Sequence, residues 1–345
     1  MKNSFLIALL FTVTAIAKSA TAADCDNSNI CTFNCGDDCT ATLNKTNKTL
    51  ELTGSGSMVE YERYHAPWYF WQADIETITL SNGLTSISRD AFGDMVYTKT
   101  VNLPETLTTI DHCAFNQNRA LEKINLPASL TSIGAMAFSN TWKLSEINIP
   151  SQVQEIEQYA FTNSKIDTFV IPENIQTLSA LAFFADGYDE MPLAHLYCPE
   201  ALASQCAAAV AYRDDAVEVK TYQYKDGVYV LKDENGDDKY YLSADNMKRA
   251  DRAETDEEKA QYTCADLNSC KANALKNRGL CFDLSGDCRD FVAADNAGRM
   301  LKVGSKTYQS LDALLKGDFD RRRIYTVDEA NFVAGKKNSI KIRYK

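Results

Sequence analysis

Cysteines are the residues of this chain with the greatest capacity for chemistry. There are eleven of them among 345 residues, more than a reduced cytosolic protein usually carries, and cysteines at this density form disulfides in exported proteins. Two groups of four and one pair are the disulfide candidates: Cys25, Cys31, Cys35 and Cys39; Cys264, Cys270, Cys281 and Cys288; and Cys198 with Cys206. Each group of four allows three pairings, which the spacing leaves open. Neither group has the paired C-x-x-C spacing or the nearby histidines of a zinc site, so we expect disulfides and no metal.

The eleventh cysteine, Cys113, follows His112 and raises the question of a nucleophile beside its base. Sequence neighbours need not face each other, and no acidic residue completes a triad here. The chain has only three histidines, and it lacks a Gly-x-Ser-x-Gly motif and a phosphate-binding loop. We therefore expect Cys113 to be a buried apolar side chain, and we predict that the protein is not an enzyme and has no catalytic residues and no cofactor.

The N-terminus indicates the compartment in which these cysteines fold. Lys2 precedes an apolar run over residues 5–16, and Ala20-Thr21-Ala22 has the small-x-small pattern of a cleavage site. The run is too short to span a bilayer comfortably, and no second apolar stretch of about 18 residues follows it. We expect residues 1–22 to be a signal peptide. The protein is then exported, to the periplasm, to the medium or to a cell surface.

A strong internal repeat determines the expected fold. An Ala-Phe pair recurs every 22 or 23 residues, and five of the seven prolines fall in another column of the same repeat; the phenylalanines are Phe92, Phe115, Phe138, Phe161 and Phe183. An Ile-x-Leu step stands before these prolines, and its period of two is typical of a short strand that the proline ends. One repeat buries too little apolar surface to fold alone. The sequence therefore predicts a solenoid of about five repeats and a degenerate sixth, with a parallel sheet.

The residues between the inward-facing positions of each strand point outward and form two columns across this sheet. The first column is Thr77, Thr100, Lys123, Glu146, Thr168 and His195, and the second is Thr79, Asn102, Asn125, Asn148, Val170 and Tyr197. Solenoids commonly bind partners on such a surface. We take the columns, Val170 apart, as the candidate binding residues for a protein or glycan. The alternative is structural, because the three stacked asparagines could form an amide ladder.

The repeat resembles the treponemal-type, BspA-like leucine-rich repeat, whose short consensus is a strand, a proline and an Ile-Gly-x-x-Ala-Phe turn. The copy at residues 131–138, Thr-Ser-Ile-Gly-Ala-Met-Ala-Phe, is nearest to it. The resemblance covers residues 35 to about 212. It implies an exported surface or host-contact protein that binds other macromolecules.

The domain organisation follows from where this repeat begins and ends. Residues 23–74 are expected to cap the front of the solenoid, with Trp68, Tyr69, Phe70 and Trp71 as the core of the cap. The alternative for these four aromatic residues is a platform that stacks on carbohydrate. The solenoid then covers residues 75–213. An alanine-rich helix closes its back, and the predicted Cys198–Cys206 disulfide ties this helix to the last strand.

Residues 218–345 lack the repeat and are predicted to form a small α+β module, so the fold class is α+β. Asn235-Gly236 is typical of a hairpin turn. Residues 245–261 are highly charged and are expected to form a linker or an exposed helix. A helix is predicted over residues 310–315, and Thr326 opens a capping-box pattern for a further short helix. Eight basic residues gather at the end: Arg321, Arg322, Arg323, Lys336, Lys337, Lys341, Arg343 and Lys345.

The net charge argues against nucleic-acid binding. Lys and Arg number 36 against 47 Asp and Glu, for a net charge of -11, which is not typical of a nucleic-acid-binding protein. The favoured function is an exported binding or adhesion protein whose partner is an extracellular or envelope protein or glycan. The alternative is a structural component of the cell envelope anchored through the basic module. The sequence leaves the oligomeric state open.

Overall fold

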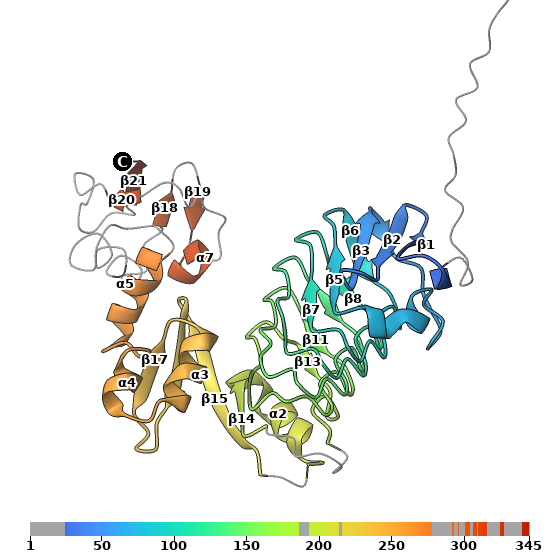
Figure 1. Cartoon of the computed structure of the whole chain (residues 1–345). Helices are drawn as coiled ribbons and strands as arrows, with labels where there is room; N and C mark the ends of the chain where they lie inside the picture. Colours follow the sequence, from blue (N-terminus) through green and yellow to red (C-terminus); the bar gives the residue numbers. More distant parts are fainter. Residues whose placement is uncertain are drawn as a thin grey trace, which may run out of the picture.

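The computed structural model describes residues 25–185, 193–213 and 216–277, followed by the shorter pieces 292, 296, 301–303, 306–308, 310–315, 325–327 and 340–344. Figure 1 shows a curved solenoid that continues into a second, smaller body at the C-terminal end. The expected signal peptide, Cys281, Cys288 and the basic residues at 321–323, 336, 337 and 345 lie outside the described residues.

The front of the solenoid is closed by three antiparallel strands, β1 (Ile30–Gly36), β2 (Cys39–Asn44) and β3 (Thr49–Gly54). Alternate side chains of these strands, such as Phe33, Leu43 and Leu52, are buried against the first coil. Disulfides join near neighbours, Cys25 to Cys31 and Cys35 to Cys39. The structure thus selects one of the three pairings that the sequence left open for this group.

The solenoid has about six turns, and its coils contribute short strands to two parallel arrays. The first array runs from β3 through β5 (Thr77–Leu80), β7 (Thr100–Asn102) and β9 (Lys123–Ile124). The second contains β4 (Gly56–Ser57), β6 (Leu84–Ile87), β8 (Thr109–Ile110), β10 (Ser132–Ile133), β11 (Glu155–Ile156) and β13 (Thr177–Leu178). The sequence predicted the first array. The second forms where the Leu-x-x-Ile step of each repeat ends.

The recurrent phenylalanines stack through the centre of the solenoid. Neighbouring rings from Phe92 to Phe183 have centroids 5.5–5.9 Å apart and are nearly parallel. Trp68 stacks on Phe92 at 5.7 Å and donates a hydrogen bond of 2.9 Å from its indole nitrogen to the carbonyl of Ala91. The column of identical residues in the sequence is therefore a continuous aromatic core that the cap extends by one ring.

The turns carry side chains in a backbone conformation that usually favours glycine. Asp90, Cys113, Met136 and Tyr159 occupy equivalent places and all have φ between 53° and 59°. Hydrogen bonds to the next coil hold this backbone, as between the Cys113 amide and the Ala135 carbonyl at 3.0 Å. These bonds offset the conformational cost of the left-handed backbone at the four residues.

The aromatic cluster of the cap divides between core and surface. Trp68 is fully buried and Trp71 nearly so, whereas 78% of Phe70 is exposed and Tyr69 is half-buried. The prediction that all four side chains form the core was wrong for Phe70. The cause is the short 3-10 helix η1 (Tyr69–Asp74), which turns successive side chains to different sides.

At the back of the solenoid the sheet continues into the C-terminal module. Strands β12 (Thr168–Val170), β14 (His195–Pro199) and β15 (Glu218–Lys225) are parallel, and β16 (Val228–Lys232) and β17 (Asp238–Tyr241) extend the sheet antiparallel. The hairpin predicted around Asn235-Gly236 is β16–β17. The turn η2 (Glu200–Leu202) and helix α2 (Ala203–Val210) follow β14, and the predicted pairing of Cys198 with Cys206 is present.

The rest of the module begins with α3 (Ala244–Arg252), α4 (Asp256–Ala260) and α5 (Leu267–Asn277), and Cys264 pairs with Cys270. The charged stretch over residues 245–261 is thus helical. A second small sheet contains β18 (Leu301–Val303), β19 (Lys306–Tyr308), β20 (Tyr325–Val327) and β21 (Ile340–Tyr344). The helix predicted over residues 310–315 is α7 (Leu311–Leu315). Thr326, the expected N-cap of another helix, lies in β20, and the remainder of that motif is outside the described residues.

Candidate binding surface

Strand register aligns the outward residues into the two predicted columns. At the front, Thr77 pairs with Thr100 and Thr100 with Lys123, and a parallel bridge joins Lys123 to Glu146. At the back, Thr168 pairs with His195, and β15 adds Glu218 to the same row. The first column is therefore longer than the sequence indicated, because Thr49 of the cap precedes Thr77.

The front of this outer sheet face is open to solvent and lined with paired charges. Glu76 lies beside the first column, and its two carboxylate oxygens form ion pairs with Lys48 Nζ at 2.5 Å and Lys99 Nζ at 2.7 Å. These hydrogen bonds lower the pKa of the Glu76 carboxyl to about 2. Lys123 and Glu146 form a further pair at 3.2 Å. Glu76 and Lys99 were not among the predicted binding residues, although their 23-residue spacing defines a third column.

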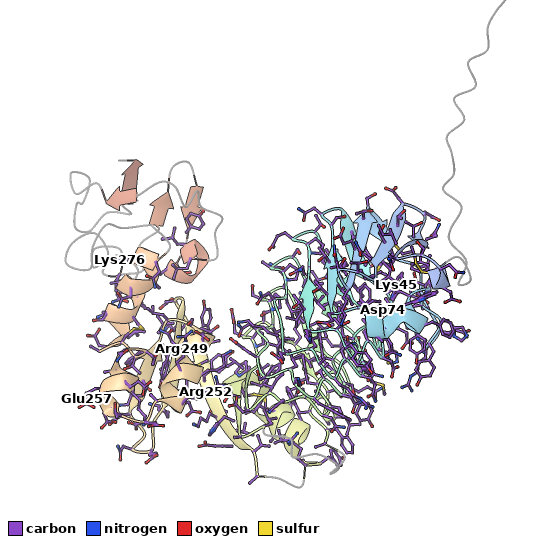
Figure 2. All side chains as sticks on the ribbon, viewed as in Figure 1. Lys45, Asp74, Arg249, Arg252, Glu257 and Lys276 are labelled. Atoms are coloured by element: carbon purple, nitrogen blue, oxygen red, sulfur yellow. A yellow bond between two sulfur atoms is a disulfide. The ribbon has the colours of Figure 1, made fainter. Side chains whose placement is uncertain are left out.

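The back of the same face is covered by helix α3. Lys248 of α3 is buried and donates a hydrogen bond of 2.8 Å to Asn148 Oδ1, and Arg252 pairs with Asp167. Figure 2 shows Arg252 at the junction of α3 and the solenoid. Burial lowers the pKa of Lys248. The helix thus replaces water over this part of the sheet.

The cover changes the status of four predicted binding residues. Thr168 and Tyr197 have the predicted register but are buried, 5% and 2% exposed, so the expectation that they face solvent was wrong. His195 lies 2.9 Å from Glu218 and 3.5 Å from Asp251 of α3, and Asn148 is held by Lys248. The cause is packing from a segment distant in the sequence. The open face therefore consists of Thr77, Thr79, Thr100, Asn102, Lys123, Asn125 and Glu146, and Asn148 at its edge remains exposed although Lys248 donates to it.

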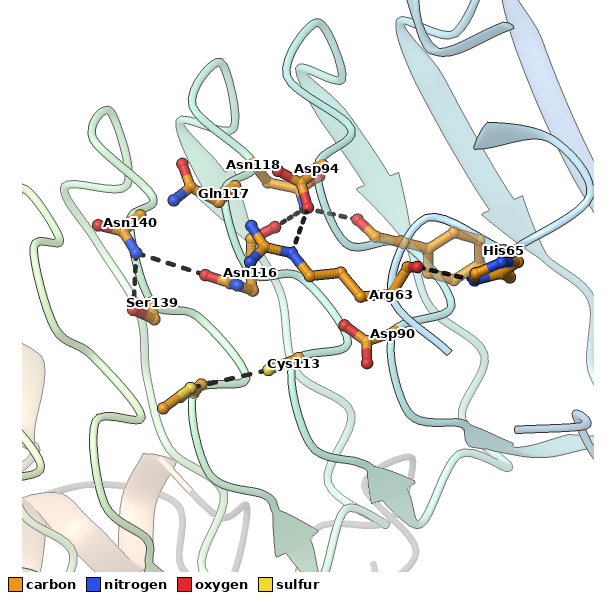
Figure 3. A network of polar contacts seen from close by, with 12 residues as sticks. Arg63, His65, Asp90, Asp94, Cys113, Asn116, Gln117, Asn118, Ser139 and Asn140 are labelled. Carbon is orange, nitrogen blue, oxygen red and sulfur yellow. Dashed lines mark hydrogen bonds and ion pairs between the residues drawn. The ribbon is translucent and has the colours of Figure 1, made fainter. Parts of the chain in front are cut away.

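An amide ladder is present, but it lies in the turns instead of on the sheet. Asn163 donates to Asn140 Oδ1 at 2.9 Å, and Asn140 donates to Asn116 Oδ1 at 3.4 Å. Figure 3 shows the part of this ladder that contains Asn116 and Asn140. On the sheet, Asn102 instead donates to Thr79 Oγ1 at 3.1 Å.

Cys113 lies near this ladder in an environment that suppresses its reactivity. Its sulfur is 3.8 Å from the Met136 sulfur, the contact drawn in Figure 3. Burial, with a smaller effect from the Asp90 carboxylate, raises the pKa of the Cys113 thiol to about 11. The thiol therefore keeps its proton at neutral pH, and a protonated thiol is a poor nucleophile.

Metal sites and membrane-spanning helices are both absent from the part of the chain that the structure describes. No group of three or more His, Cys, Asp or Glu side chains there is arranged to hold a metal ion. None of the helices there is long and apolar enough to cross a membrane.

Comparison with known proteins shows which family of repeats residues 67–187 match. Residues 67–187 match the BspA type leucine-rich repeat region, in six copies. Among solved structures, a leucine-rich repeat protein from Eubacterium ventriosum is 21% identical, with a TM-score of 0.42, over 60% of this chain and 49% of that one. A leucine-rich cell surface protein from Faecalibacterium prausnitzii is 18% identical, with a TM-score of 0.31, over 60% of each chain.

A leucine-rich repeat protein from T. pallidum is 19% identical, with a TM-score of 0.31, over 47% of this chain and 81% of that one. This chain thus spans about half of the first structure and three fifths of the second. A search of curated proteins found no match.

Proposed function

We propose, from the premise that residues 67–187 are a BspA-type leucine-rich repeat region, that this protein is exported and binds an extracellular or envelope protein or glycan through its open sheet face. The observation that carries the proposal is the outer face itself. Over the first coils it presents hydroxyl, amide and paired charged groups to solvent in regular rows.

The chemistry of this face suits recognition. Repeated polar side chains on a rigid sheet provide hydrogen-bond partners at a fixed spacing of about 4.8 Å per strand. Such a surface loses little conformational entropy on binding, which favours specific contact. Export is supported by the disulfides at both ends of the solenoid, because disulfides persist in oxidising compartments.

The test uses the oxidised chain of residues 23–345, immobilised and screened against extracellular matrix proteins and glycans. The chain is kept whole because β15 pairs along β14, so truncation would expose a new sheet edge. The informative variant is the double change Lys123→Ala with Glu146→Ala. We expect it to weaken binding about tenfold, the effect of losing one good polar contact.

A second charged pair provides the matched control. Lys232 and Asp238 form an exposed pair at 2.6 Å on the β16–β17 hairpin, away from the open face. The double change Lys232→Ala with Asp238→Ala should leave affinity unchanged. Equal affinity of the two double variants, or no saturable binding to any target, would contradict the proposal.

A further inference from the structure

A cavity lies where the solenoid meets the C-terminal module. It has a volume of about 600 Å³, and both bodies contribute to its wall. The solenoid supplies strand ends and loops around Ile147 and Val170, and the module supplies Tyr229, Leu242 and Leu315. Cavities between two bodies of one chain are common ligand sites.

The cavity has an unbalanced negative charge. Glu173 is the only charged side chain among the described residues that line it. Within the described part of the chain Glu173 has no ion-pair partner, whereas the carboxylates near α3 are paired with Lys220 or Arg252. A carboxylate in such a place favours a cationic guest.

The next residue in the chain, Asn174, supplies a second acceptor to the lining of the cavity. The side-chain oxygen of Asn174 is buried and has no hydrogen-bond partner within the described residues, while its amide nitrogen donates to the Val153 carbonyl at 2.7 Å. A buried acceptor without a donor costs free energy that a ligand can recover by supplying an N–H group. Glu173 and Asn174 together therefore favour a ligand that has several hydrogen-bond donors.

Tyrosine rings form the aromatic part of the same wall. Tyr229 lies with its ring centroid 4.7 Å from that of Tyr224 and 5.2 Å from that of Tyr222. Burial raises the pKa of Tyr229, and the charge of Glu173 raises it further. Both residues line the cavity. Aromatic faces near a carboxylate attract cations.

We propose that this junction cavity binds the ammonium or guanidinium group of a lysine or arginine side chain presented by a polypeptide. The charged head fits Glu173 and Asn174, and the aliphatic stem fits the apolar wall formed by Ile147, Val170 and Leu242. An anionic ligand would be repelled by Glu173. This inference is independent of the open sheet face, which lies on the first coils.

Blocked amino acids test the proposal on the full oxidised chain. The probes are N-acetyl-lysine methylamide, N-acetyl-arginine methylamide and the uncharged N-acetyl-norleucine methylamide, followed by calorimetry or ligand-observed NMR. We expect saturable binding of a charged probe and at least tenfold weaker binding of norleucine. Glu173→Gln should remove this preference, because it keeps the shape and loses the charge.

The control variant is Glu155→Gln, an exposed glutamate on β11 outside the cavity, which should leave binding unchanged. Equal binding of the charged probes to the Glu173→Gln variant, or no binding of either charged probe to the wild type, would overturn the proposal. Tetramethylammonium serves as a further arm. Its binding in place of both charged probes would assign the cavity to a small free cation and also overturn a peptide source.

Discussion

The two ends of the outer sheet face have the same strand register but different surroundings. At the front, the columns that begin at Thr77 and Thr79 meet solvent, while at the back their continuation at Thr168 and Tyr197 lies beneath α3. Strand pairing thus decides which way a side chain points. A segment elsewhere in the chain decides whether that side chain is available to a partner.

The largest expected effect is a difference in stability between substitutions at the covered end and at the open end of the sheet face. Tyr197→Ala removes a buried ring from the covered end and should lower the free energy of unfolding by about 3–5 kcal/mol. Asn125→Ala, an exposed position of the same column, should change it by less than about 0.5 kcal/mol. Urea unfolding measures both. Similar losses in the two variants would remove the distinction between the ends.

A smaller effect concerns the buried Lys248, whose pKa is lowered from 10.5 by burial. Between the lowered value and 10.5 the unfolded chain binds the extra proton, so the stability of the wild type should rise with pH across that window. Lys248→Met should remove this slope and raise the stability at neutral pH. The check is urea unfolding from neutral to alkaline pH.

The exposed Lys259 of α4 supplies the control for this experiment. Lys259→Met should keep the slope of the wild type. Parallel pH profiles for the wild type and Lys248→Met would show that α3 does not desolvate the lysine.

The smallest expected effect is at the open end and concerns the pKa of Glu76. The pKa of Glu76 is held at about 2 by Lys48 and Lys99, below its ordinary value of 4.5. The stabilising contribution of this carboxylate is therefore present above the ordinary value and is lost as pH falls towards 2. NMR titration should give this low midpoint. Replacing both lysines by methionine, or adding salt, should return it towards the ordinary value.

The repeat made much of the fold predictable from the sequence. The fixed spacing of Phe92 to Phe183 and the Ile-x-Leu step determined the strand register, because every coil must present the same face to the core. The Cys198–Cys206 pairing was also predictable, since one cysteine occupies the inward strand column and the other the adjoining helix.

The covered end was not predictable by the same argument. Lys248 and Asn148 are 100 residues apart, and no local pattern marks their contact. The charged sequence of α3 is typical of a helix exposed to water, yet its single lysine, Lys248, is buried. Likewise the asparagine ladder could form in either of two asparagine columns, and backbone geometry in the turns brings Asn140 and Asn163 within bonding distance.

The closed ends of the aromatic stack bear on how such a protein changes over evolution. Trp68 terminates the stack at the front, and β15 continues the sheet at the back. A duplication that inserts one 23-residue unit among the first coils, ahead of Asn148, would preserve both terminations. Each insertion would lengthen the open face by about 4.8 Å and leave the α3 contacts intact. The length of the open face can therefore change by whole repeats while both ends of the solenoid stay closed in the same way.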